Sequence, residues 1–157
     1  MSVPIIILTI LILGVAGGVV YVYMDYSNSS DIPPSYVNVN TSNVGTEQIS
    51  YLLYQLEANK LHNAFFSSDT PKLEIMIGSE VYNSEVVKGK ITTKIGSIED
   101  KDLQIIMFKE DFLAIIKGNI NEKLKESVSN NRTKIIVSAS KIKLAGKGYL
   151  ELYEKFS

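Results

Sequence analysis

The stretch Asp102–Ile120, "DLQIIMFKEDFLAIIKGNI", changes its hydrophobic period halfway along. Leu103, Ile105 and Met107 alternate with other residues, as on one face of a strand, whereas from Phe108 the apolar residues recur at helical spacing. This change predicts a buried strand that leads directly into a helix with an apolar face. The chain should therefore combine a sheet with helices that cover it.

The same reading extends in both directions from this stretch. Apolar alternation predicts four more strands, over residues 73–77, 81–87, 91–95 and 133–139. Helical spacing predicts helices over residues 47–66, 109–117, 121–129 and 142–156. The order is helix, four-strand meander, two helices, strand, helix. It predicts an α+β domain in which helices cover one face of an antiparallel five-stranded sheet.

Three residues are expected to mark helix ends. Thr46 suits the N-cap of the first helix and Asn121 that of the third, because their side-chain oxygens can accept a hydrogen bond from a free backbone N–H. Gly118 follows Lys117 and can take the left-handed conformation that ends many helices. The last helix is expected to be weak, since it contains two glycines.

The chain divides into three parts: residues 1–24, 25–46 and 47–157. Val3–Met24 contains 22 residues without a charge, and as a helix it would extend for about 33 Å, enough to cross a hydrocarbon core of about 30 Å. It predicts a transmembrane helix. The alternative is a cleavable signal peptide, which the missing basic start disfavours. Residues 25–46 are polar, contain two prolines and predict a stalk.

Small residues in the transmembrane segment are candidates for helix packing. Gly14 and Gly18 form a G-x-x-x-G pair that lets another transmembrane subunit approach closely. Orientation is weakly encoded, because no Lys or Arg flanks the segment. Three glycosylation acceptors, Asn28, Asn40 and Asn131, favour a soluble domain outside the cytoplasm, on a single-pass protein of the cell membrane.

The composition excludes several classes of function. All 16 basic residues lie from Lys60 onward, and they are interleaved with acids, so the pattern does not predict nucleic-acid binding. The chain has no cysteine, which excludes disulfides and thiolate metal sites. A chain rich in Ile, Lys, Tyr and Asn without Cys or Trp is typical of an archaeal source.

No motif predicts catalysis, a metal or a cofactor. The sequence contains no G-x-S-x-G, no G-x-x-x-x-G-K-[ST] and no H-E-x-x-H. The only histidine, His62, is given no role, because it has no partner ligand in the sequence. Asp102 and its acidic neighbours are expected in a solvated turn, and Lys147 on a solvated helix face. The sequence therefore predicts a protein that is not an enzyme.

Several motifs together resemble the sterol carrier protein type two (SCP2-like) lipid-transfer domain. The Gly89-Lys90 pair, the strand Asp102–Met107 and the helix Asp111–Asn119, "DFLAIIKGN", match the family's pattern. The resemblance covers residues 47–157 and is specific from Lys90 to about Lys125. The family usually has an apolar passage after its second helix, where this chain has "KESVSNNRTKIIVSAS" instead.

The resemblance implies a hydrophobic crevice between sheet and helices that holds an acyl chain or isoprenoid. Its expected lining residues come from the helices and their ends: Phe108, Phe112, Ile116, Tyr149, Leu152 and Tyr153. The alternative is that these side chains fill an ordinary core. Two functions stay open: a membrane-anchored domain that binds a lipid, and an accessory single-pass subunit of a larger membrane complex without a ligand.

Overall fold

The computed structural model describes residues 39–64 and 67–156. The predicted transmembrane segment, with Gly14 and Gly18, lies outside them, as do Asn28 and most of the stalk. Among the described residues, none of the helices has the length and the apolar character needed to cross a bilayer.

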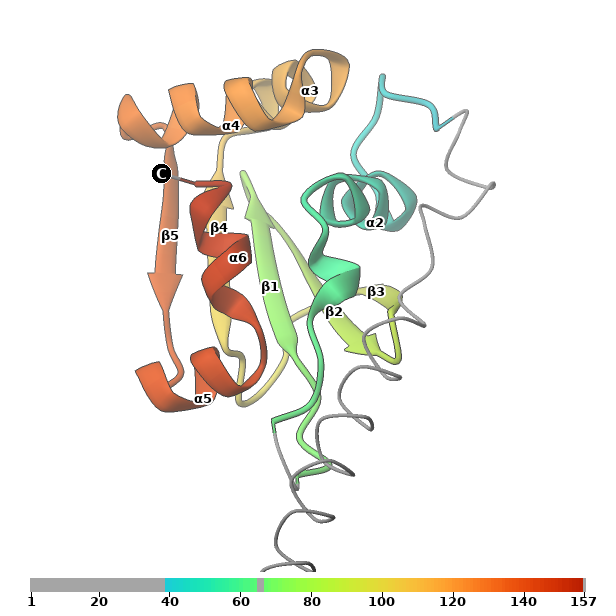
Figure 1. Ribbon diagram of the computed structural model, residues 1–157. Helices are drawn as coiled ribbons and strands as arrows, with labels where there is room; N and C mark the ends of the chain where they lie inside the picture. Colours follow the sequence, from blue (N-terminus) through green and yellow to red (C-terminus); the bar gives the residue numbers. More distant parts are fainter. Residues whose placement is uncertain (1–38, 65–66, 157) are drawn as a thin grey trace, which may run out of the picture.

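The expected α+β architecture is confirmed, and the strands lie close to their predicted positions (Figure 1). A sheet carries helices at its face and at both of its ends. The elements in chain order are α2 (Thr46–Gln55), the short 3-10 helix η2 (Ala58–Lys60), β1 (Lys72–Ile77), β2 (Glu80–Val87), β3 (Lys90–Ile95), β4 (Leu103–Met107), α3 (Lys109–Lys117), α4 (Ile120–Ser129), β5 (Thr133–Val137), α5 (Lys141–Gly146) and α6 (Tyr149–Glu154).

The prediction of an antiparallel sheet is wrong, because the sheet is mixed. Its strand order is β3-β2-β1-β4-β5, and β4 runs parallel to β1. The meander ends at β3, and the connection to β4 then crosses the outer face of β1. There the Glu74 carboxylate accepts hydrogen bonds from Ile98 N at 3.2 Å and from the Ser97 hydroxyl. The chain thereby reaches the far side of β1 and enters β4 in the same direction as β1.

One face of the sheet is buried and the other is polar. The inward residues of β1 and β4 alternate with outward ones; Leu73, Ile75, Leu103 and Ile105 are each fully buried. Figure 1 shows α2 and α6 on this face and the α3–α4 pair at one end of the sheet. The single core buries apolar residues from the sheet and from all the α-helices.

Two predicted helices are interrupted by residues in the left-handed region. Glu57 has φ 61°, so the first helix ends at Gln55 and is followed by η2 instead of continuing to residue 66. Gly148 has φ 82° and divides the last helix into α5 and α6. A bulky residue is disfavoured at such a backbone angle, whereas Gly adopts it freely.

The three expected helix ends are also corrected. The N-cap of α2 is Gly45 instead of Thr46. Asn119, not Asn121, caps α4, through a contact of 3.5 Å from Glu122 N to its Oδ1. Gly118 has φ −108° and is extended, because the chain turns directly into α4 there.

Candidate functional site

The predicted lining residues fall into two groups. Phe112, Ile116, Tyr149 and Leu152 are buried in one core, and Tyr153 is partly buried against it. Phe108 lies outside that core, at the N-cap of α3, with 60% of its side chain exposed. Whether the buried five hold a ligand stays a prediction, since a filled core and a lined crevice both bury them.

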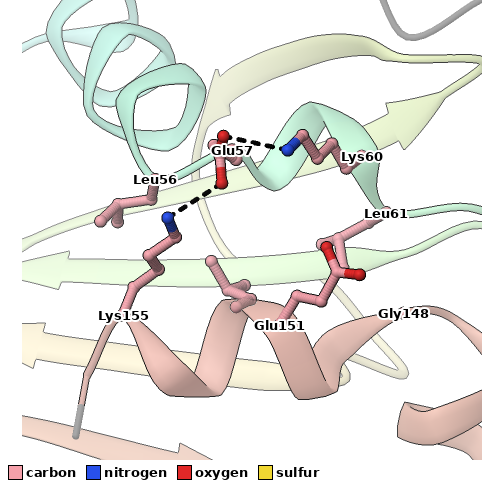
Figure 2. Close-up of a pocket in the computed structure, with 8 residues that line it drawn as sticks. Leu56, Glu57, Lys60, Leu61, Gly148, Glu151 and Lys155 are labelled. Carbon is pink, nitrogen blue, oxygen red and sulfur yellow. Dashed lines mark hydrogen bonds and ion pairs between the residues drawn. The ribbon is translucent and has the colours of Figure 1, made fainter.

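A small depression lies at the seam between η2 and α6. Leu56, Leu61 and Leu152 line this depression. Figure 2 shows the charged side chains of Glu57, from the η2 side, and Lys155, from the end of α6, reaching toward each other. The depression is shallow: a water molecule's centre can occupy about 10 Å³ of it, about the space that one water needs. The seam is therefore closed to an acyl chain in this conformation.

Glu57 forms two ion pairs at the outer side of this seam, and one of them crosses it. Glu57 lies 3.0 Å from Lys60 Nζ and 2.9 Å from Lys155 Nζ, and the second pair joins the α2–η2 segment to the end of α6 (Figure 2). The hydrogen bonds with Lys155 and Lys60 hold the pKa of Glu57 below its ordinary value. All three side chains are about one-third exposed or more, so water and salt weaken these pairs.

The other end of α6 is fixed by a buried charge cluster. Asp102 and Lys147 are fully buried, and Lys147 Nζ lies 2.9 Å from Asp102 Oδ2. The ammonium group also donates to Thr70 O at 2.7 Å and lies 3.0 Å from Asp69 Oδ2. Three acceptors thus surround the three N–H donors of Lys147, which offsets the loss of hydration.

Asp102 holds several segments through one carboxylate. Its Oδ2 accepts from Lys72 N at 2.9 Å as well as from Lys147. Its Oδ1 accepts no hydrogen bond but lies 3.1 Å from Lys143 Nζ on α5, so the charge of Lys143 still compensates it. The cluster therefore ties the start of β1, the start of β4 and the α5–α6 hairpin together.

The rim of the cluster keeps its charges across the physiological range. Burial acts to raise the pKa of Asp69, but the ion pairs with Lys143 and Lys147 lower it overall. The ion pair with Asp69, and then the one with Asp102, raise the pKa of Lys143 above its ordinary value. Opposite charges thus stabilise each other's ionised forms.

Tyr149 connects the charge cluster to the apolar core. Its hydroxyl lies 3.2 Å from Asp102 Oδ2 and 3.5 Å from Lys72 O. Burial, and then the charge of Asp102, raise the pKa of Tyr149 well above its ordinary value. The hydroxyl is therefore a neutral donor, and the ring of this predicted lining residue is held at one end.

The expectation that Asp102 and Lys147 are solvated is wrong. The local sequence of each residue predicts a solvated side chain, but each is buried because the other lies beside it. A weak signal exists in the sequence. Asp102 directly precedes the buried strand, and Lys147 stands between two glycines, which suits a tight turn more than an exposed helix face.

The described residues contain no group of three or more His, Asp or Glu side chains that could hold a metal. Of the expected glycosylation acceptors, Asn40 and Asn131 are exposed, and Asn131 has a left-handed φ of 58°. Their modification stays a prediction.

Comparison with known proteins gives limited similarity. No family model matches the chain, and no curated protein is detectably similar in sequence. A mutant of the sec-alkyl sulfatase PisA1 has a TM-score of 0.48 at 14% identity; the match covers 74% of this chain but 16% of the sulfatase.

Two SCP2 proteins are also similar. The UbiJ-SCP2 ubiquinone synthesis protein has a TM-score of 0.41 at 10% identity, with 70% of this chain and 94% of that chain covered. Sterol carrier protein 2 like 2 from Aedes aegypti has a TM-score of 0.35 at 16% identity, with 62% and 91% covered. All three TM-scores lie below 0.5, so the functions of these proteins do not carry over to this chain.

Proposed function

We propose that this protein is a membrane-anchored, non-catalytic domain that binds the apolar tail of a lipid. The supporting observation is the uneven attachment of α6. This helix covers apolar residues of the core, is fixed at its start by buried charges, and is held at its end by an exposed ion pair. A tail would enter where the attachment is weak, between η2 and α6.

The proposed ligand follows from the chemistry of that seam. Leu56, Leu61 and Leu152 offer apolar contact, and Lys60 and Lys155 stand at its outer side. An apolar slot with a few polar groups at its mouth suits an acyl chain or isoprenoid whose charged or polar head stays in water. The resemblance of the strand–helix motif to the SCP2-like domain supports the same ligand class.

The anchor completes the proposal. In this proposal residues 1–24 cross the membrane once, the stalk runs from residue 25 toward Val44, which packs against the core, and the domain stands on the extracytoplasmic side. The domain can then take its ligand from the bilayer to which it is attached.

Photo-crosslinking of the full chain in membranes tests this function. A fatty acid and an isoprenoid that each carry a diazirine should label peptides from η2 and α6, and labelling should saturate with concentration. Leu152→Trp fills the seam and should abolish that label. Leu150→Trp is the matched control, since Leu150 lies on the same helix with 65% of its side chain exposed. Label confined to residues 1–24 in the unaltered chain would contradict the proposal.

A second candidate function is an accessory single-pass subunit without a ligand. The observation that favours it is the closed seam, which holds no more than about one water in this conformation. Native mass measurement of the complex after mild-detergent extraction separates the two functions. A chain that leaves the membrane without other subunits excludes this alternative.

A further inference from the structure

The two edges of the sheet are protected very differently. At the β3 edge, Ile91 N donates to the Tyr54 hydroxyl of α2 at 3.1 Å. Lys90 and Lys94 add charges to the same strand. A covering helix and lysines are two common means of preventing edge-to-edge pairing. The β3 edge is therefore closed to another strand.

The β5 edge is less protected within the described part of the chain. β5 pairs with β4 on one side and is the last strand of the sheet (Figure 1). Ile136 and Val137 are 43% and 45% exposed, and Ile142, which follows in α5, is 86% exposed. The only charged residue of β5 is Lys134.

The backbone of β5 is oriented to accept another strand. Met107 O accepts from Gly78 N, at the β1 side of β4, whereas Asp102 O accepts from Ser138 N, at the β5 side. Backbone groups of successive residues in a strand point to opposite sides. Lys134 and Ile136 thus bond to β4, and the N–H and C=O groups of Ile135 and Val137 point away from the sheet.

From this we infer that the β5 edge is the contact surface for a second copy of this chain, paired antiparallel with Ile136 at the two-fold axis. This register sets Ile136 against its own copy and Ile135 against Val137. Lys134 then lies opposite Ser138, so no like charges meet. The contact is isologous and closes as a dimer, and it is independent of the proposed ligand.

Other registers are less compatible with the strand. Moving the axis to Lys134 sets two ammonium groups against each other, which destabilises a cross-strand pair. Moving the axis to Ile135 requires the outward-facing backbone groups of Thr133 to bond to the other copy. That residue is 2% exposed, and its hydroxyl lies 2.8 Å from the Ser127 hydroxyl of α4. The accessible part of the β5 edge is therefore centred on Ile136.

Cysteine crosslinking of the full chain in membranes tests this dimer, because the natural sequence contains no cysteine. Ile136→Cys should form a disulfide between copies in high yield, since facing residues of a non-hydrogen-bonded pair have Cα atoms about 4.5 Å apart. Thr92→Cys is the control: it is exposed on the outer face of the protected edge strand β3. Equal yields from the two variants would overturn the inference, because tethering to one membrane raises both equally.

A second experiment tests the register. Chains with Lys134→Cys mixed with chains that carry Ser138→Cys should form mixed disulfides. Adding Ile136→Lys to both chains should reduce the yield at least tenfold, because two ammonium groups then meet at the axis. Ile136→Lys in one chain and Ile136→Glu in the other should restore it. A yield that ignores the charge at position 136 would overturn the inference, even if the chains associate through another segment.

Discussion

The two ends of α6 are attached to the domain by different physics. At its start, Lys147 and Asp102 form a charge pair with both side chains fully buried. At its end, Lys155 and Glu57 form a pair whose side chains are 30% and 44% exposed. The two pairs have the same separation of 2.9 Å, so distance alone does not distinguish them. The dielectric around them does.

This difference indicates which end can move. Breaking a buried pair leaves a charge without water or a partner, which costs several kcal/mol. Breaking an exposed pair returns two charges to water and costs about 0–1 kcal/mol. Local opening of a protein starts where its contacts are weakest. The comparison therefore predicts that α6 opens from Lys155 while its start remains fixed, which is the motion that the proposed ligand requires.

The largest expected effect is at the buried end. Asp102→Ala should lower the free energy of unfolding by about 3–5 kcal/mol, because the buried side chain of Lys147 loses a carboxylate partner. Urea denaturation of the full chain in detergent, followed by circular dichroism, measures this change. Asp100→Asn is the control: Asp100 is exposed in the same connection, and its substitution should change stability by less than about 0.5 kcal/mol. If Asp102→Ala lowers the free energy of unfolding by no more than Asp100→Asn does, the Asp102–Lys147 pair does not fix the start of α6.

The next effect concerns the middle of α6. Leu152→Ala should cost about 2–3 kcal/mol, near the low end for a buried leucine, since the shallow depression beside it lets neighbours relax. Leu150→Ala, on the exposed side of the helix, is the matched control. If the seam binds a lipid tail, a saturating fatty acid should restore part of the loss in Leu152→Ala alone. Restoration of both variants equally would indicate that the fatty acid acts elsewhere.

A smaller effect is expected at the hydroxyl of Tyr149. Tyr149→Phe should cost about 1 kcal/mol, because it removes a donor to Asp102 while the ring stays in place. The pKa of Tyr149 is raised, so this loss should be the same at pH 6 and pH 9. A double-mutant cycle with Asp102→Asn measures the coupling. Additive losses in stability would mean that the Tyr149 hydroxyl is not coupled to Asp102.

The sequence predicted the local elements well because hydrophobic period is a local property. The strand–helix change at Phe108 is present as expected, and β5 lies inside the predicted strand. The parallel pairing of β4 with β1 depends on the path of the β3–β4 connection across Glu74. The hydrophobic period of the sequence carries no information about that path. A meander was the simplest arrangement of the same strands.

The burial of the Asp102–Lys147 charge pair could not be predicted from the sequence, for a related reason. Asp102 and Lys147 are 45 residues apart in the sequence, and each alone has the pattern of a solvated residue. A charge is buried only where a partner meets it, so its burial is a property of the pair. The apolar residues Phe112, Ile116 and Leu152 are buried as their helical spacing predicts, because burial of an apolar side chain needs no specific partner; whether they line a crevice stays a prediction.

The smallest expected effect is at the exposed end, and pH makes it measurable. The pKa of Glu57 is below its ordinary value of 4.5 because Lys155 and Lys60 stabilise the carboxylate. Its contribution to stability is therefore present above pH 4.5 and is lost as the pH falls through the lowered value. Glu57→Gln should cost a few tenths of a kcal/mol at pH 7, because the pair is exposed to solvent, and this cost should shrink as the pH falls below 4.5. Hydrogen exchange of α6 should rise in this variant from Lys155 toward Tyr149. Faster exchange that begins at Tyr149 would instead place the weak end of α6 at the buried charges.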